Sequence, residues 1–387
     1  MLVGQQIGDD ADVRPLARTK NWWRADLASS MATEKLSVQY FVNASSFGLR
    51  YHPWFRDASV LQLHNLHGGY FAHSALPLLT RGKPTVWYLH DMWAATGHCA
   101  YSYECERWRT GCGACPYLSE HPPLRRDLTA LNWRVKQSVY LHTDMTLVTP
   151  SRWLARVAAE SPLLSRFPSR VIPYGIDLDT FHSRPQAGAR AALGLPLEGH
   201  VVLIAGRGRR KGAALVQETL ARTAAGGGRL TALVMGEGEG TPAPQPGVNV
   251  VELGHVRERE RVADAYLAAD VLLHPALADN LPNSILESMA SGRPVVAIGH
   301  GGVPEIVRHL EDGYLVEHAS PSALAIGLRT LLDDDALRER LGRSGAAKVE
   351  RDFTLEAQAR AFLAVYEELV EERQAKTRAR AIRGANV

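Results

Sequence analysis

The sequence predicts an α/β protein made of two doubly wound domains. Short apolar runs rich in Val, Ile and Leu alternate with longer helix-forming stretches, which is the pattern of parallel strands joined by crossover helices. The chain has 387 residues, too many for one ordinary hydrophobic core. Because the alternation occurs in both halves of the chain, we expect one domain in each half.

The first half contains three predicted strands and three predicted helices. A helix expected at 124–140 has an apolar face that should pack on the core, and a helix lying on a membrane surface is the alternative. The predicted strands are 58–65, 85–91 and 145–151, the predicted helices are 72–81, 124–140 and 152–160, and the apolar face consists of Leu124, Leu128, Leu131, Val135 and Val139.

The second half repeats the alternation more clearly. Its predicted strands are 200–206, 230–236, 248–254, 270–276 and 293–299, and its predicted helices are 212–223, 257–269 and 283–291. Pro, Gly and turn-forming Asp cluster at 171–188, where we expect the two domains to join. The predicted organisation is a first domain at 1–172, a second at 173–352, and a C-terminal helix with a basic tail at 353–387.

Composition and charge narrow the class of protein. The sequence is 45% hydrophobic and 22% charged with a net charge of +3, typical of a globular protein and far from the basic patches of nucleic-acid binders. No apolar run reaches the ~18 residues of a membrane span, and the start has no signal region. We therefore expect a cytoplasmic protein without a nucleic-acid partner.

The strongest local signal is the loop and helix that follow the strand at 270–276. Asp279 lies in the loop and Glu287 lies eight residues later, at the start of a helix, so both can face one ligand. A carboxylate with spare lone pairs accepts hydrogen bonds from neighbouring hydroxyls of a sugar, and a helix N-terminus attracts a diphosphate. Either residue alone is equally well explained as a loop or capping residue, but together they favour a ligand site.

A second signal follows the strand at 200–206. In the sequence IAGRGRRKG, Arg207 and Lys211 are placed to bind a phosphate, and the glycines allow close approach of the backbone. The stretch contains no G-x-G-x-x-G pattern, so a nicotinamide site fits poorly. Ordinary surface Arg and Lys residues are the alternative explanation.

These motifs resemble the retaining glycosyltransferases of family 4, which have the GT-B architecture of two facing Rossmann-like domains with a cleft between them. The resemblance rests on Asp279 and Glu287 with seven residues between them, PVVA at 294–297, and the GG-x-x-E turn that ends at Glu305. It extends over nearly all of the second half, although Asp279 stands where the family usually has Glu.

The resemblance implies roles for particular residues. Glu287 would hold the donor ribose and Asp279 the donor sugar, while Arg207 and Lys211 would neutralise the leaving diphosphate. Backbone near Asn280 and Leu281 would contact sugar hydroxyls. Fixed cations then stabilise the negative charge where it develops, and catalysis requires no metal.

The first half resembles a subgroup of this family from bacterial exopolysaccharide and lipopolysaccharide gene sets, including colanic-acid-type transferases. His90 ends a strand and matches a family histidine near the reacting sugar, and Asp91 either shares that role or caps the turn. His64, Asn65 and His67 end another strand, and we assign them to the acceptor side. Family members begin with a further strand and a glycine-rich turn before the strand that residues 1–6 resemble, so we expect a start codon further upstream.

All four cysteines, Cys99, Cys105, Cys112 and Cys115, fall within residues 98–116. Zinc bound by these thiolates, with His98 able to replace one of them, would hold a long loop in place. Reduced thiols and disulfides are the other two interpretations, and the zinc spacing is matched only in part.

The prediction is therefore a hexosyltransferase-type enzyme that moves a sugar from a nucleotide diphosphate sugar to a glycan or lipid-linked glycan, with retention, in cell-surface polysaccharide biosynthesis. It needs no catalytic cofactor and works in the cytoplasm or at the inner membrane face. Two alternatives are a zinc-stabilised regulatory protein with a vestigial nucleotide cleft and a sugar-nucleotide epimerase.

Overall fold

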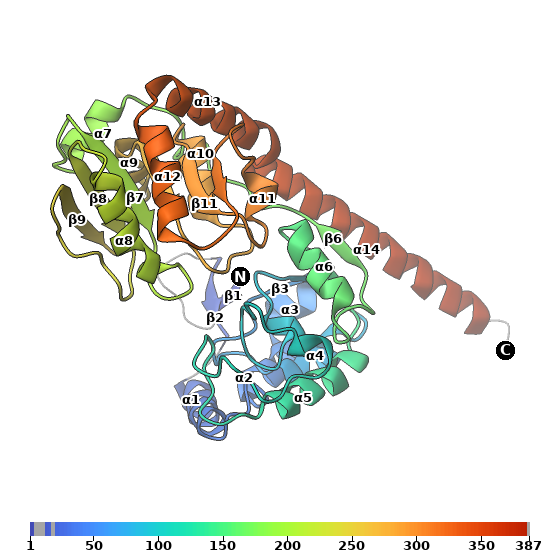
Figure 1. Ribbon diagram of the computed structural model, residues 1–387. Helices are drawn as coiled ribbons and strands as arrows, with labels where there is room; N and C mark the ends of the chain where they lie inside the picture. Colours follow the sequence, from blue (N-terminus) through green and yellow to red (C-terminus); the bar gives the residue numbers. More distant parts are fainter. Residues whose placement is uncertain (4–11, 17–19, 385–387) are drawn as a thin grey trace. The chain divides into compact units, whose positions relative to one another are not determined.

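The computed structural model describes residues 1–3, 12–16 and 20–384, and its elements form two compact units (Figure 1). Unit 1 comprises Met1–Ile172 and Ala361–Val387, and unit 2 comprises Pro173–Arg360. A parallel sheet flanked by helices lies at the centre of each unit, which confirms the predicted α/β class.

Unit 2 contains a six-stranded, fully parallel sheet in the order β12-β11-β10-β7-β8-β9. The four central strands are apolar and largely buried, as expected when helices cover both faces of a parallel sheet. The edge strand β9 shows only partial burial. The bounds are β7 His200–Ala205, β8 Leu230–Met235, β9 Val248–Gly254, β10 Val271–His274, β11 Val295–Ile298 and β12 Tyr314–Val316.

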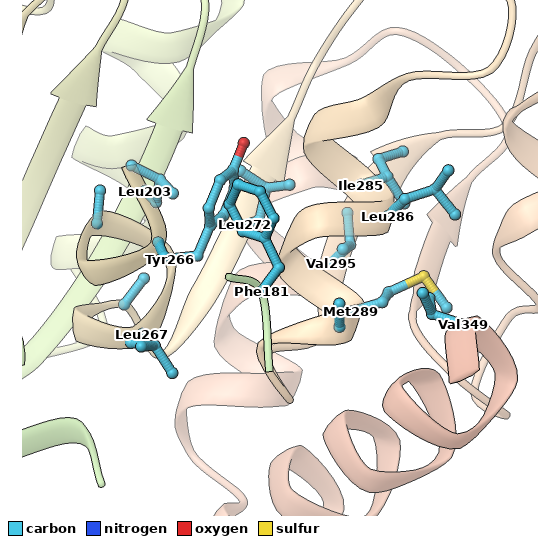
Figure 2. Close-up of a cluster of buried hydrophobic side chains, with 14 of the residues drawn as sticks. Phe181, Leu203, Tyr266, Leu267, Leu272, Ile285, Leu286, Met289, Val295 and Val349 are labelled. Carbon is cyan, nitrogen blue, oxygen red and sulfur yellow. The ribbon is translucent and has the colours of Figure 1, made fainter. Parts of the chain in front are cut away.

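The helices of unit 2 pack on this sheet through apolar faces. Figure 2 shows one of the resulting clusters, in which Phe181 and Tyr266 lie beside Leu272 of β10, with Met289 and Val349 further along. Burying a Leu side chain of this kind stabilises the fold by roughly 1.5–3 kcal/mol. The helices are α7 Gln186–Ala192, α8 Ala213–Ala224, α9 Arg259–Ala268, α10 Asn283–Ala290, α11 Val303–Ile306, α12 Pro321–Leu332 and α13 Asp335–Asp352, and α14 Leu355–Gly384 begins here and continues into unit 1.

Unit 1 contains a four-stranded parallel sheet in the order β3-β4-β5-β6. β4 and β5 are fully buried, whereas the edge strands β3 and β6 are partly or fully exposed. β3, β4 and β5 lie within the three predicted strands, which are confirmed. The bounds are β3 Leu61–His64, β4 Thr85–Tyr88, β5 Thr146–Thr149 and β6 Ser169–Val171.

Several helices surround this sheet, and a separate two-stranded sheet pairs β1 with β2. Residues 4–6 of the strand expected at the start of the chain lie outside the described residues. The elements are β1 Leu2–Val3, β2 Arg14–Pro15, α1 Lys20–Lys35, α2 Ala44–Gly48, α3 Pro53–Asp57, α4 Leu76–Thr80, α5 Thr129–Leu141 and α6 Arg152–Glu160, with short 3-10 turns at Leu49–Tyr51, His73–Ala75, Trp93–Ala95 and Arg107–Arg109.

The apolar face predicted for the helix at 124–140 is confirmed in part, because Val139 is buried in the core of unit 1 and Val135 packs against that core. The helix starts only at Thr129, and Leu131 is 45% exposed, whereas Lys136 is buried. The Lys136 ammonium donates to the backbone oxygens of Trp93 and Thr96, so the buried face of α5 fits against loop carbonyls as well as apolar side chains. Hydrophobic periodicity does not detect a polar contact of this kind.

Candidate functional site

The topology of unit 2 brings together two loops that are distant in the sequence. β7 is the first strand of the unit, and it lies between β8 and β10. The loops after β7 and β10 therefore both leave the carboxyl ends of adjacent strands, and they turn in opposite directions. Such a switch point is where open α/β sheets bind ligands. Arg210 and Lys211 lie in the first loop and Asp279 lies in the second.

Asp279 connects these loops through charged contacts. Its Oδ2 atom lies 2.7 Å from the Lys211 ammonium and 3.3 Å from the Arg210 guanidinium. The ring of His274, the last residue of β10, lies 3.5 Å away. Burial opposes ionisation of this carboxyl group, but the contacts with His274, Lys211 and Arg210 hold the pKa of Asp279 well below its usual value. Asp279 is therefore a fixed anion beside two cations.

Two glycines allow the loops to approach closely. Gly212 ends the loop after β7 with φ +74°, and a Cβ there would lie 1.9 Å from the Pro275 oxygen. Gly301 begins the turn after β11 with φ +58°, and a Cβ there would lie 2.0 Å from the backbone oxygen of Asp279. Any larger residue at either position would push the loop away from the switch point.

Glu287 lies on α10, where its Oε2 atom accepts a 2.7 Å hydrogen bond from the Tyr266 hydroxyl of α9. Burial raises the pKa of Glu287, while the hydrogen bond from Tyr266 and the positive charges of Arg259 and Lys211 oppose the rise. Lys211 thus acts electrostatically on both acidic residues. Sequence reasoning missed Tyr266, because a tyrosine on a core-facing helix carries no motif of its own.

The structure distinguishes among the basic residues of the loop after β7. Arg207 donates to the Gly236 oxygen, pairs with Glu252 at 3.2 Å and also contacts Thr241, so it joins this loop to β9 and to the segment before that strand. Arg210, which sequence reasoning did not select, contacts Asp279 and donates to the Ala278 oxygen at 3.0 Å. Arg210 and Lys211, rather than Arg207 and Lys211, are the cations grouped at Asp279.

The residues next to Asp279 are buried. Asn280 is 2% exposed, and its backbone amide donates to the Asp279 Oδ1 atom at 3.1 Å. Leu281 belongs to the hydrophobic core of unit 2. The backbone of this loop is therefore held by packing on one side and by the Asp279 carboxylate on the other.

The predicted histidines of unit 1 also come together. The Nδ1 atom of His64, at the end of β3, lies 2.9 Å from the Nε2 atom of His90, which follows β4. Gln62 contacts the other ring nitrogen of His64 at 2.9 Å and so extends the chain of hydrogen bonds. Burial, together with the neighbouring His64, lowers the pKa of His90 to about 4, so this ring is neutral at pH 7. Gln62 carried no signal in the sequence.

The remaining acceptor-side candidates lie beside this pair. His67 Nε2 lies 2.7 Å from Asp91 Oδ2, and the other oxygen of Asp91 accepts from the Trp93 amide at 2.8 Å. Asp91 therefore both caps a turn and orients His67. Asn65 adopts φ +34°, and its backbone oxygen accepts a 2.7 Å hydrogen bond from the Tyr70 hydroxyl.

The cysteines do not support the zinc interpretation. Across the described parts of the chain, no three His, Cys, Asp or Glu residues are grouped to hold a metal ion, and Cys99, Cys105, Cys112 and Cys115 are all free thiols. They line a cavity of about 20 Å³ together with His98, whose Nε2 atom lies 3.2 Å from the Cys115 sulfur. Burial raises the pKa of Cys99 to about 12 and that of Cys112 to about 11.

Two family models match the chain. Residues 34–180 match Glycosyltransferase Family 4, and residues 199–334 match Glycosyl transferases group 1. The first match contains the paired histidines, and the second contains Arg210, Lys211, Asp279 and Glu287.

Individual relatives agree with these matches. A D-inositol 3-phosphate glycosyltransferase of Xylanimonas cellulosilytica is 34% identical over 53% of this chain and 52% of its own length, so the chain spans about half of that relative. A putative colanic acid biosynthesis glycosyl transferase, WcaC of Escherichia coli, is 26% identical over 68% of this chain and 66% of its own. The structure of Anabaena HepE in complex with UDP and glucose has a TM-score of 0.57 at 18% identity, covering 81% of this chain and 77% of HepE. The chain belongs to the family 4 glycosyltransferases with the GT-B fold.

Proposed function

We propose that this chain transfers a sugar from a nucleotide diphosphate sugar to a glycan or lipid-linked glycan, with retention of configuration. The observation that carries the proposal is the grouping of Arg210, Lys211 and Asp279 at the switch point of unit 2. Two fixed cations beside a fixed anion suit a ligand that carries both a diphosphate and a ring of hydroxyl groups.

The chemistry follows from the charges. Cleavage of the bond between the sugar and the diphosphate leaves negative charge on the diphosphate, and Arg210 and Lys211 are placed to stabilise it. Asp279 accepts hydrogen bonds from hydroxyls of the sugar, and the Glu287 carboxylate accepts them from the ribose. These cations take the role that a metal ion has in other transferases, so the proposed reaction requires no metal.

In unit 1 we assign His90 to the reacting sugar and its acceptor. A neutral imidazole held by His64 orients a hydroxyl group by hydrogen bonding without placing a positive charge beside the sugar as its anomeric carbon becomes electron-poor. His64, Asn65, His67 and Asp91 shape the same region.

The likeness to WcaC, a putative colanic acid biosynthesis glycosyl transferase, supports a role in bacterial cell-surface polysaccharide synthesis. HepE was solved with UDP and glucose, which makes UDP-sugars the first donors to test. No helix within the described residues has the length and apolarity needed to cross a membrane. We place the enzyme in the cytoplasm, with its acceptor presented at the inner membrane face.

The proposal is tested by measuring sugar transfer from whichever nucleotide sugar raises the melting temperature of the protein. Glu287→Ala removes the carboxylate expected to hold the ribose and should abolish transfer. Glu339→Ala, on an exposed face of α13, is the matched control and should transfer like the wild type. Unchanged turnover in Glu287→Ala would overturn the assignment of the site.

A further inference from the structure

A recess in unit 1 lies at the ends of β3 and β4 opposite to the paired histidines. It has a volume of about 650 Å³ and opens beside Ala58 and Ser59, which precede β3, and beside Lys83 and Pro84, which precede β4. His64 and His90 lie at the opposite, carboxyl ends of the same two strands. α3, α4 and the C-terminal part of α14 supply the other walls.

The lining of this recess is strongly cationic. It contains five positively charged side chains and no acidic one; the cations are Arg56, Arg81, Lys83, Arg373 and Arg378. Within the described residues, the four arginines form no ion pair and no side-chain hydrogen bond. By contrast, Arg170 of the same unit pairs with Glu368 of α14 at 2.8 Å. Like charges gathered around one recess repel one another unless an anion lies between them.

Lys83 gives the recess a fixed wall. Its ammonium donates to the backbone oxygens of Arg56 at 3.1 Å and Ala58 at 2.5 Å, and it lies 4.9 Å from the centre of the Phe55 ring. Burial and the charge of Arg373 lower the pKa of Lys83, and Asp57 only partly opposes this.

We propose that this recess binds a phosphate-bearing ligand, either a soluble phosphate ester or diphosphate, or the phosphate of a lipid headgroup. The planar guanidinium matches phosphate oxygens in pairs, and four arginines and one lysine lining one recess suit a multiply charged group. A volume of about 650 Å³ falls within the range of roughly 300–1,000 Å³ for small-molecule sites, so more of the ligand than its phosphate enters. The site is separate from the proposed donor site and does not depend on it.

Isothermal titration of the full chain with inorganic pyrophosphate at low ionic strength tests the soluble source. The double variant Arg81→Ala/Arg373→Ala should weaken one class of binding by about tenfold or more, because each charge-assisted contact is strong. Arg134→Ala/Arg156→Ala, which removes two exposed arginines of α5 and α6, is the matched control. The variant Lys211→Ala should weaken any pyrophosphate binding in unit 2. It should not change the affinity of the recess for pyrophosphate.

Sedimentation with vesicles tests the lipid source. The wild type should sediment with phosphatidylcholine vesicles that contain phosphatidylglycerol, and the Arg81→Ala/Arg373→Ala variant should stay in the supernatant. Neither protein should sediment with vesicles of pure phosphatidylcholine. If the double variant folds poorly, Arg378→Glu replaces it in both experiments, because this exposed side chain lines the recess and its substitution removes no contact. Loss of binding in either arm supports the proposal and identifies the source. Equal binding of wild type and variants in both arms overturns it.

Discussion

The Lys211 ammonium lies 2.7 Å from the Asp279 carboxylate, and this contact joins the loops after β7 and β10. The two residues are 68 positions apart in the sequence, and they meet because the strands before them are neighbours in the sheet. Without a ligand, each neutralises the other. A diphosphate sugar would engage both, with the cation on the phosphate and the anion on the sugar hydroxyls.

Asp279→Asn should separate these two tasks. The change removes the anion but keeps both cations, so a nucleoside diphosphate should bind at least as tightly as to the wild type. The nucleotide sugar should be turned over about 10–100-fold more slowly, because charge-assisted hydrogen bonds of roughly 1.5–3 kcal/mol are lost. Calorimetry with the nucleoside diphosphate and kinetics with its sugar measure the two effects. Equal losses in both would contradict the assigned role.

Arg207 and Arg210 should differ in their effects. Arg210→Ala removes a cation beside Asp279 and should weaken donor binding by about tenfold. Arg207→Ala removes contacts to Gly236 and Glu252 and should lower the melting temperature while changing donor affinity less. Calorimetry and thermal unfolding of both variants distinguish them, and a larger loss of affinity in Arg207→Ala would show that the assignment is reversed.

Tyr266→Phe should move the acid limb of the pH–rate profile to higher pH. Glu287 must be ionised to accept hydroxyl hydrogen bonds, and the hydrogen bond from Tyr266 lowers its pKa. Removing that donor raises the pKa further, so activity is lost at a higher pH as the solution is acidified. Tyr314→Phe, in β12, is the control. Coinciding acid limbs in all three proteins would rule out a link between Tyr266 and Glu287.

Unit 2 was largely predictable from the sequence, and the reason is topological. Fully buried parallel strands appear as continuous apolar runs, so the places where they end, and the loops after them, can be located. Among Arg207, Arg209 and Arg210, however, only the folded loop determines which guanidinium faces Asp279. Tyr266 and Gln62 were missed for a similar reason, since each acts through one hydrogen bond that leaves no periodic pattern.

Gln62→Met should slow transfer without weakening donor binding. The amide of Gln62 contacts His64, which in turn contacts His90, so the change loosens the ring assigned to the reacting sugar. Loss of one neutral hydrogen bond, roughly 0.5–1.5 kcal/mol, predicts a fall in kcat of about 2–12-fold. Steady-state kinetics with varied donor give kcat and KM separately. A change confined to the KM of the donor would contradict a positioning role.

Lys136 should give the fold a characteristic dependence on pH. Burial lowers its pKa to about 7, although the nearby Cys112 and Cys99 oppose the shift. Between pH 7 and about pH 10 the unfolded chain keeps this proton while the folded chain releases it, so stability rises with pH. Relative to Lys136→Met, the free energy of unfolding should rise by up to about 1.4 kcal/mol per pH unit. Urea unfolding at pH 7, 8 and 9 measures the difference, and parallel curves would exclude the titration.

Unit 1 was harder to predict. α5 buries Val139, as hydrophobicity indicated, but it also buries Lys136 and exposes Leu131. The cysteine segment has the composition of a metal site, yet its four cysteines are free thiols and the described residues contain no group of side chains placed to hold a metal ion. Both outcomes depend on which loop carbonyls and side chains surround a residue, and those contacts arise only in the folded chain.

Thermal unfolding of the full chain with UDP-, GDP-, ADP- and TDP-sugars tests the donor site most directly. One of these donors, at about 100 times its Kd, should stabilise the wild type by about 2.7 kcal/mol, a rise of a few degrees in Tm. Arg210→Ala/Lys211→Ala should lose most of that rise, whereas the control Arg134→Ala/Arg156→Ala should keep it. If no nucleotide sugar stabilises the wild type, or if one stabilises the Arg210→Ala/Lys211→Ala variant equally, the switch point of unit 2 is not the donor site.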